Sequence, residues 1–254
     1  DYKGCIFNAL REVECMNVVE QYNLTLQIEV LKEQSAEILA RLCKLVDESG
    51  TNDCVEALQA YSHIVNTKLY LATSIHELDV LKSDMVKLEN TIKASLVQAS
   101  HDVSDVKDVK ANSDIPDIES YSSEDFDKAL ERTIDLLTFN KNISSTPRAV
   151  ILGGQSGAGK TTIHRVKMLE YKGDYIVIDG DTYRAQHPHF RELQEKYGVD
   201  SVDYTKTFAG KMVEAVIDKL SALQYNLIIE GTLRSAAVPI NTATLLKSKG
   251  YTVD

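Results

Sequence analysis

The chain has 254 residues, enough for one large domain or two ordinary ones. Its formal net charge of −10 argues against a general surface for nucleic acid or for an anionic membrane, because contacts to phosphate need Lys and Arg. No apolar run approaches the length that crosses a bilayer, and no signal peptide is visible, so we expect a cytoplasmic protein that binds neither nucleic acid nor membrane.

The four cysteines all lie in the first quarter of the chain. None forms a C-x-x-C pair, and no histidine stands at zinc-finger spacing, so the sequence indicates neither a structural zinc nor a disulfide framework. We interpret them as reduced, mostly buried thiols, in keeping with a cytoplasmic location. They are Cys5, Cys15, Cys43 and Cys54.

Residues 1–100 are predicted to form a helical bundle or a long helical hairpin. Apolar side chains recur at helical spacing in two long stretches, and Gly50 follows the first where a helix C-cap is expected. Residues 55–65 favour a shorter helix between them. The apolar positions of the long stretches are Leu24, Ile28, Leu31, Ile38, Leu42 and Leu45, then Leu78, Leu81, Met85, Leu88, Ile92 and Leu96. We interpret most of them as core positions that pack one helix against another.

Residues 101–120 break this pattern. They are acidic, contain few large apolar side chains and include Pro116, so we interpret them as a linker. Ser122 and Asp125 then carry the signature of a capping box, which opens a helix. The apolar face of that helix is predicted to consist of Phe126, Leu130, Ile134 and Leu137.

Residues 121–254 alternate strands with helices. The predicted strands are 148–152, 175–179, 226–230 and 251–254. The predicted helices that follow them are 162–171, 190–197, about 204–223 and 239–250. Continuous β-branched runs that alternate with helices indicate a buried parallel sheet with right-handed crossovers.

A complete G-x-x-x-x-G-K-T phosphate-binding motif stands between the first strand and the helix after it. Its glycines let backbone N–H groups surround phosphates, and the helix N-terminus that follows favours anions. Lys160 is placed to reach the β- and γ-phosphates, and Thr161 is the predicted ligand of Mg²⁺. The predicted cofactor-binding residues are Gly154, Gln155, Ser156, Gly157, Ala158, Gly159, Lys160, Thr161 and Thr162. The fold class is therefore α + α/β: a helical bundle or hairpin followed by a P-loop kinase-type parallel sheet with flanking helices.

Two further strand ends carry acidic residues followed by glycine. Residues 179–184 read Asp-Gly-Asp-Thr-Tyr-Arg, and residues 230–234 read Glu-Gly-Thr-Leu-Arg. In an open parallel sheet the carboxyl ends of the strands meet at the ligand-binding edge, so we expect both loops to converge on the phosphate loop. Carboxylates there can orient metal-bound waters or accept a hydroxyl proton, which favours phosphoryl transfer to a small molecule. A noncatalytic nucleotide-binding scaffold remains an alternative.

Three runs of the α/β half resemble the zeta toxin family. They are residues 152–162, 178–188 and 225–234, which hold the phosphate loop and the two acidic strand ends. The helical half is similar to the helical domain of the antitoxin in PezA/PezT-type epsilon/zeta systems, at residues 19–33 and 67–72. The resemblance implies that one chain carries an antitoxin-like domain over 1–100, an acidic linker over 101–120 and part of a zeta-toxin-like domain over 121–254.

The resemblance also implies an activity and its residues. Zeta toxins phosphorylate the 3′-hydroxyl of UDP-N-acetylglucosamine with ATP and Mg²⁺. By motif, Asp181 is expected to be the catalytic base, while Lys160 and Glu230 organise the reacting phosphate. The residues expected to hold the nucleotide sugar are Glu214, Thr232, Arg234 and Thr242.

The antitoxin domains of this family cover the ATP site, so the resemblance implies that the helical half inhibits the kinase half, within one chain or swapped between two chains. Zeta toxins continue past the last residue of this sequence, and the kinase half is therefore expected to be incomplete. Two alternatives stay open: a catalytically silent toxin–antitoxin assembly, and a P-loop kinase for another small molecule.

Overall fold

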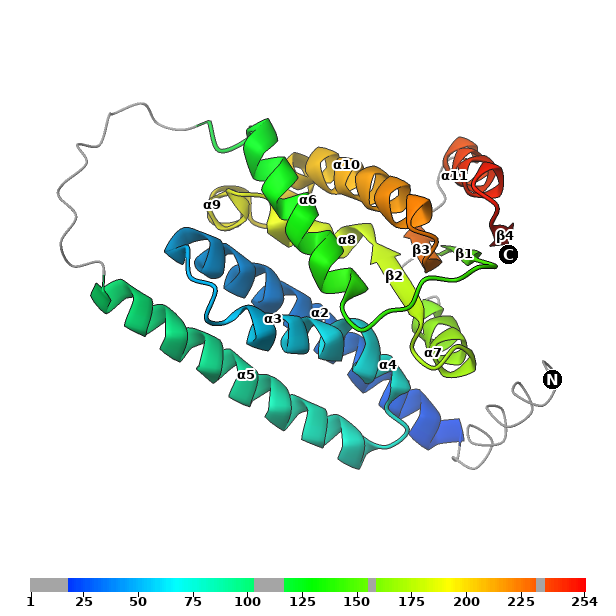
Figure 1. Ribbon diagram of the computed structural model, residues 1–254, viewed down its shortest axis with the longest axis horizontal. Helices are drawn as coiled ribbons and strands as arrows, with labels where there is room; N and C mark the ends of the chain where they lie inside the picture. The colour runs from blue at the N-terminus through cyan, green and yellow to red at the C-terminus, as the bar shows by residue number, and fades with distance from the viewer. Residues whose placement is uncertain (1–17, 103–116, 155–158, 232–235) are drawn as a thin grey trace.

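The computed structural model of the chain describes residues 18–102, 117–154, 159–231 and 236–254. A helical half lies along one side of a small α/β half (Figure 1). Most of the linker that the sequence predicts falls outside the described residues, so its bounds stay a prediction. In the part of the chain that the structure describes, no helix is both long and apolar enough to cross a membrane.

The helical half consists of two long helices and a broken shorter one. Its elements are α2 (Val18–Ser49), α3 (Val55–His63), the π-helical turn η1 (Ile64–Lys68), α4 (Leu69–Leu71) and α5 (Ile75–Asp102). The predicted apolar stretches form its core, where Leu24 and Ile28 of α2 pack with Leu78 and Met85 of α5. Leu45 departs from the prediction and is exposed, because Cys43 and Val46 take the inward positions there.

The predicted shorter helix continues beyond residue 65 through the π turn. After this turn, adjacent side chains of the helix serve different cores, because neighbouring residues of a helix point in different directions. Leu69 packs with the helical half, whereas Tyr70 packs with the sheet against Val150 and Met168. The helical half is therefore anchored in the α/β half by a buried aromatic ring.

The α/β half is built on a four-stranded parallel sheet in the order β2-β3-β1-β4. The strands are β1 (Arg148–Gly153), β2 (Tyr175–Asp179), β3 (Asn226–Gly231) and β4 (Thr252–Val253). Alternate side chains serve opposite faces. Ile176 and Ile229 pack against α6 (Ser123–Thr138) and α10 (Ser201–Ala222), whereas Val177 and Ile228 pack against α7 (Lys160–Glu170) and Tyr70.

The remaining elements follow the predicted order with small shifts. They are α8 (Gly180–Tyr183), η2 (Arg184–Gln186), α9 (Phe190–Tyr197), η3 (Gly198–Asp200) and α11 (Ala237–Ser248). The capping box at the start of α6 is confirmed, since Ser122 and Asp125 bond reciprocally. The sequence did not predict α8 and η2, which turn the chain directly after β2. The described cysteines, Cys43 and Cys54, are free and buried, as expected.

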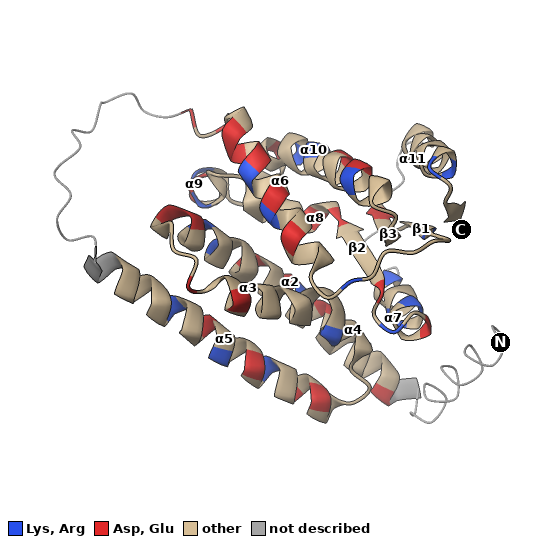
Figure 2. Cartoon of the chain, in the orientation of Figure 1, with Lys and Arg blue, Asp and Glu red and all other residues tan. Residues whose placement is uncertain are grey.

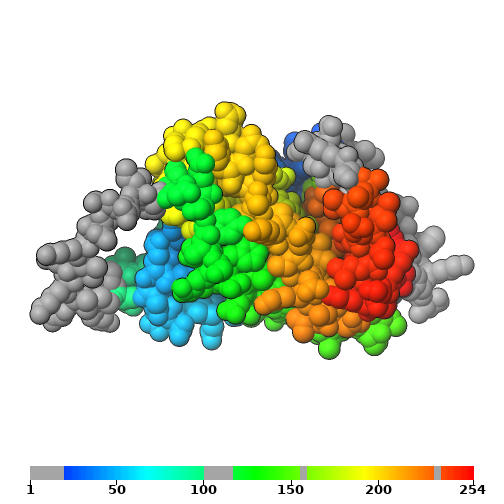
Figure 3. Space-filling view, turned by 90° about the horizontal axis from the view of Figure 1, so that it is seen from above, coloured from blue at the N-terminus to red at the C-terminus, as the bar shows by residue number. Residues whose placement is uncertain are grey.

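Polar contacts also join the two halves. Arg165 of α7 donates to Thr25 Oγ1 at 3.0 Å and to the carbonyl of Ala72 at 2.8 Å. Arg132 of α6 pairs with Asp47 of α2. From above, α3 (cyan) and α6 (green) lie side by side (Figure 3). These contacts hold α2 beside the carboxyl ends of the strands.

Candidate functional site

A cleft of about 560 Å³ lies at the carboxyl ends of β2, β3 and β1. The register places Glu230 of β3 beside Asp179 of β2 on one side and Leu152 of β1 on the other. The predicted convergence of the phosphate loop with the two acidic strand ends is therefore confirmed by strand pairing, which needs no particular loop conformation.

The described ends of the phosphate loop lie at this cleft. Gly159 caps α7 in the left-handed region, at φ 77°, where a side chain would strain the backbone. Lys160 Nζ donates to the carbonyl of Gly154 at 3.0 Å, and Thr161 is buried in the first turn of α7. Gly154, Lys160 and Thr161 all line the cleft. Thr162 is exposed and does not.

The end of β2 positions two carboxylates differently. Asp179 caps α8, where its Oδ1 accepts from the N–H of Asp181 at 3.1 Å. The side chain of Asp181 is 80 % exposed, and it accepts from Arg184 Nε at 3.0 Å. Arg184 is fixed in turn by donating to the carbonyl of Val202. The predicted catalytic base is thus in the cleft, in water, and beside a cation.

Glu230 lies at the centre of the charged groups. Its carboxylate is 3.7 Å from Lys160 Nζ and 3.0 Å from the Nε2 of His164, without hydrogen-bond geometry to that ring. Burial raises the pKa of Glu230, while attraction to Lys32 opposes the rise. Burial also lowers the pKa of His164 to about 3, and Lys32 and Lys160 contribute to this effect, so the imidazole is neutral near pH 7.

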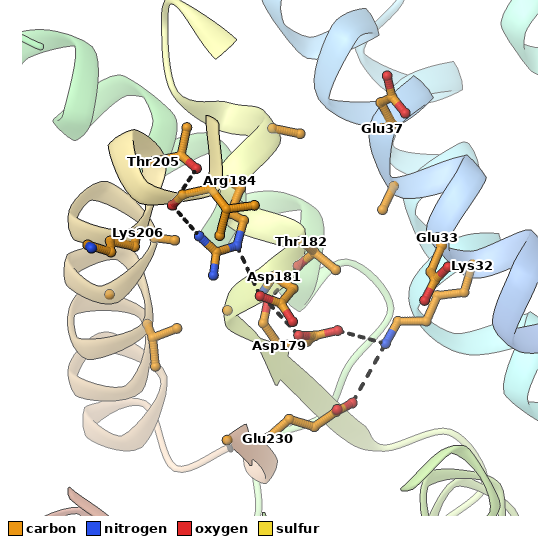
Figure 4. Close-up of a pocket in the computed structure, with 18 of the residues that line it drawn as sticks. Lys32, Glu33, Glu37, Asp179, Asp181, Thr182, Arg184, Thr205, Lys206 and Glu230 are labelled. Atoms are coloured by element: carbon orange, nitrogen blue, oxygen red, sulfur yellow. Dashed lines mark hydrogen bonds and ion pairs between the residues drawn. The ribbon is translucent and has the colours of Figure 1, made fainter. Parts of the chain in front are cut away.

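A lysine from the helical half completes this cluster. Lys32 of α2 extends its ammonium between two carboxylates, 3.2 Å from Asp179 and 3.7 Å from Glu230 (Figure 4). Burial by itself would lower the pKa of Lys32, but interactions with Tyr70, Asp179 and Glu230 outweigh burial and raise it, so the ammonium stays charged. Nothing in the sequence pattern around Lys32 predicts this position.

Charged side chains line both walls of the cleft. The α2 wall carries a row of carboxylates at one-turn spacing, whereas the facing wall holds Arg184 beside Asp181, with Asp179 and Glu230 nearby (Figure 4). The carboxylates on α2 are Glu29, Glu33 and Glu37. Basic residues also concentrate on α7, in contrast to the acidic surface of α6 (Figure 2). The α/β wall therefore combines cations with carboxylates, and α2 adds further negative charge to the cleft.

The sugar-nucleotide residues inferred from the family resemblance stay a prediction, since only two of the four are described. Glu214 is exposed on α10, and Thr242 is half-buried on α11; neither lines the described cleft. Thr232 and Arg234 lie outside the described residues, as do Gln155, Ser156, Gly157 and Ala158 of the phosphate loop. Asp179 and Arg184, which line the cleft, are visible in the sequence as parts of the acidic strand end.

A parallel sheet whose first strand leads through a glycine-rich G-K-T segment into a helix defines a P-loop kinase-type fold, here with a helical region docked on its open edge. The zeta toxin family matches residues 132–254, and the bacterial epsilon antitoxin family matches residues 20–95. The chain therefore has a fused antitoxin–toxin architecture, in which residues 20–95 match the antitoxin family and residues 132–254 match the toxin family.

Individual relatives agree with this division. Toxin PezT of Streptococcus pneumoniae serotype 4 is 58 % identical over 137 residues, which are 54 % of this chain and 54 % of that protein. Toxin zeta of Streptococcus pyogenes is 42 % identical over 134 residues, covering 53 % of this chain and 47 % of that protein. Antitoxin PezA of Streptococcus pneumoniae is 29 % identical over 90 residues, which are 33 % of this chain and 57 % of that protein.

A solved structure of the PezAT chromosomal toxin–antitoxin system of Streptococcus pneumoniae is also similar. It matches with a TM-score of 0.53 and 58 % identity, over 54 % of this chain and 57 % of that one. The chain spans about half the length of the curated toxins that it matches.

Proposed function

We propose that the α/β half is a kinase that transfers the γ-phosphoryl group of ATP to the 3′-hydroxyl of UDP-N-acetylglucosamine, and that the helical half inhibits it. The observation that carries the phosphoryl-transfer proposal is the convergence of Lys160, Asp181 and Glu230 on one cleft. The similarity to zeta toxins supports the choice of substrate.

The residues of the cleft would have separate roles in the reaction. Lys160 would neutralise the β- and γ-phosphates, with the glycine-rich segment around them. Asp181 is the proposed base because it is exposed to the cleft and can accept a proton. In the step, the sugar hydroxyl gives its proton to Asp181 while its oxygen bonds the γ-phosphorus. The bond from that phosphorus to the β-phosphate oxygen breaks, and ADP leaves with the electron pair.

The donor atoms near Lys160 fit Mg²⁺. Within the described ranges, no group of three or more His, Cys, Asp or Glu is placed to hold a metal ion. Mg²⁺ needs no such group, because it usually binds one or two carboxylates together with waters and substrate phosphates. Thr161 and Glu230 would supply oxygen on the protein side, and the ammonium of Lys32 marks a place where a cation is accommodated. When bound, Mg²⁺ would neutralise charge on the transferred phosphoryl group.

The inhibitory role is supported by the α2 wall. Glu33 and Glu37 bring negative charge to a cleft that would have to admit nucleotide phosphates. Lys32 of the same helix forms ion pairs with the carboxylates of Asp179 and Glu230. The same observation favours the second candidate function, a silent toxin–antitoxin assembly without turnover. A kinase acting on another small molecule remains the alternative on the substrate side.

The test is phosphorylation of a panel of nucleotide sugars and simple sugars with ATP and Mg²⁺, followed by mass spectrometry. The whole chain is compared with Lys32→Met, which keeps the length of the side chain and removes its charge. We expect phosphorylated UDP-N-acetylglucosamine with the variant and less with the parent chain. Turnover of a different acceptor would overturn the substrate, and no turnover by either protein would favour the silent assembly.

A further inference from the structure

The ammonium of Lys32 is held as a cation in a built site. Asp179 Oδ2 lies 3.2 Å from it and Glu230 Oε1 lies 3.7 Å from it, and the three side chains are only 13 %, 20 % and 10 % exposed. The ring of Tyr70, which is buried, lies 5.6 Å below the ammonium on the protein side. Two carboxylates at this depth need a positive partner, because an unpaired buried charge is strongly unfavourable.

The oxygens around Lys32 are divided between partners. Oδ1 of Asp179 already accepts the N–H of Asp181, which leaves Oδ2 to face the cation. Oε2 of Glu230 faces Lys160 at 3.7 Å, which leaves Oε1 for Lys32 and His164. One carboxylate oxygen from each of two adjacent strands therefore faces the same ammonium.

That position suits a small hard cation. Carboxylate oxygens are the ligands that Mg²⁺ and Mn²⁺ favour, and Thr161 lines the same cleft, as do Gly154 and Lys160. The strand register fixes the spacing of the two carboxylates, since Asp179 and Glu230 are paired residues of β2 and β3. The site is thus formed by the sheet and does not depend on α2.

We propose that Asp179 and Glu230 form a divalent-cation site and that Lys32 of α2 takes the place of the cation there. Metal binding and insertion of Lys32 then compete, because the two cations would stand at the same position and repel each other. The inference rests on the proposed function, whose reaction uses this cleft, and it specifies how the helical half would inhibit: by removing the metal position.

The experiment measures Mn²⁺ binding to the whole chain by electron paramagnetic resonance, without nucleotide. The parent is compared with Lys32→Met and with Lys44→Met. Lys44 lies on the same helix and also reaches the α/β half, donating to the carbonyl of Pro188, but it is not at the carboxylates. A charge within about 4–6 Å changes proton affinity by about tenfold or more, so we expect Lys32→Met to bind Mn²⁺ at least about tenfold more tightly. Lys44→Met should bind as the parent does.

Two further variants make the result specific. Adding Asp179→Asn to Lys32→Met should remove the gain, because the site loses one of its two carboxylates. Lys32→Arg should bind Mn²⁺ as weakly as the parent, since it keeps the positive charge. Equal affinity of the parent and Lys32→Met, or a gain that survives Asp179→Asn, would overturn the proposal. Circular dichroism establishes that each variant is folded.

A second measurement covers the case in which Lys32→Met does not fold. In the parent chain, Mg²⁺ should increase hydrogen exchange of the amides around Lys32, and it should have no such effect in Asp179→Asn. Unchanged exchange in the parent at saturating Mg²⁺ would overturn the inference. Failure of the proposed kinase activity is distinguishable, because metal binding is read without ATP or acceptor.

Discussion

The two walls of the cleft are held in different ways. The α/β wall is fixed by main-chain pairing, in which Asp179, Glu230 and Leu152 lie side by side on three hydrogen-bonded strands. The α2 wall is held by side chains that cross between the halves, above all Lys32 and Tyr70. Main-chain ladders withstand single substitutions, whereas side-chain contacts do not. The positions of Asp179 and Glu230 therefore do not depend on the helical half, whereas the position of α2 depends on individual side chains.

The largest expected effect is on the chemistry of the α/β wall. Asp181→Asn should lower turnover by about a hundredfold to ten-thousandfold, because the amide keeps the shape of the side chain but cannot accept the hydroxyl proton. The measurement is the phosphorylation rate in the Lys32→Met background. Asp84→Asn on the exposed surface of α5 is the matched control and should leave the rate unchanged. Turnover within a few-fold of the background would transfer the role of base to Asp179.

The next effect tests Tyr70, the buried side chain that anchors the helical half to the sheet. Tyr70→Ala should lower the free energy of unfolding by about 3 to 5 kcal/mol, because it leaves a cavity between the helical half and the sheet. Tyr22→Ala is the matched control: Tyr22 is 69 % exposed on α2, and its loss should cost about 0.5 kcal/mol or less. Urea unfolding of both variants measures the difference. Equal losses would mean that Tyr70 does not join the halves.

A polar contact between the halves should matter less. Arg165→Ala removes the hydrogen bonds to Thr25 and to the carbonyl of Ala72, and should cost about 2 to 3 kcal/mol of unfolding free energy. Lys87→Ala, which removes an exposed ion pair on α5, should change it by about 0.5 kcal/mol at most. If the two substitutions cost the same, Arg165 contributes to the surface only and the docking of α2 depends on apolar contacts.

The smallest expected effect is a pH dependence at the junction of the walls. The pKa of His164 is lowered to about 3 by burial, so the folded state keeps it neutral while the unfolded chain protonates it near its usual pKa of 6.5. The stability that this depressed pKa provides is fully present above pH 6.5 and is lost progressively as the pH falls toward 3. Between pH 7 and pH 5 the loss is on the order of 1 to 2 kcal/mol.

Urea unfolding at the two pH values measures this dependence. His164→Gln should reduce the difference in unfolding free energy between pH 7 and pH 5, whereas the exposed His76→Gln on α5 should not. An unchanged difference in His164→Gln would show that other groups, such as the carboxylates of the cleft, account for the acid sensitivity.

The same contrast explains what could be predicted from the sequence. The strands, the phosphate loop and the convergence of Asp179 and Glu230 follow from local patterns and from the geometry of any parallel sheet. Lys32 could not be found in this way. It stands between Leu31 and Glu33 in a long amphipathic helix, where a lysine ordinarily faces solvent. Its role depends on where α2 docks, and only tertiary packing decides that.

Residues taken from the family resemblance stay a prediction. Glu214 and Thr242 match family positions in sequence and do not line the described cleft, although Val213, next to Glu214, does.

The π turn was missed because Ile64 and Val65 continue an apolar helical pattern, and nothing in that pattern marks the change to π-helical hydrogen bonding.

The short helix α4 has a consequence for how the molecule comes apart. Its Leu69 lies in one core and its Tyr70 in the other, so a single stretch of backbone belongs to two hydrophobic cores at once. The two cores should therefore melt in one cooperative transition, and complete departure of the antitoxin-like region would expose apolar side chains on the sheet. Departure of Lys32 from the carboxylates would need only a local opening of α2, because the buried ring of Tyr70 can stay in its own core.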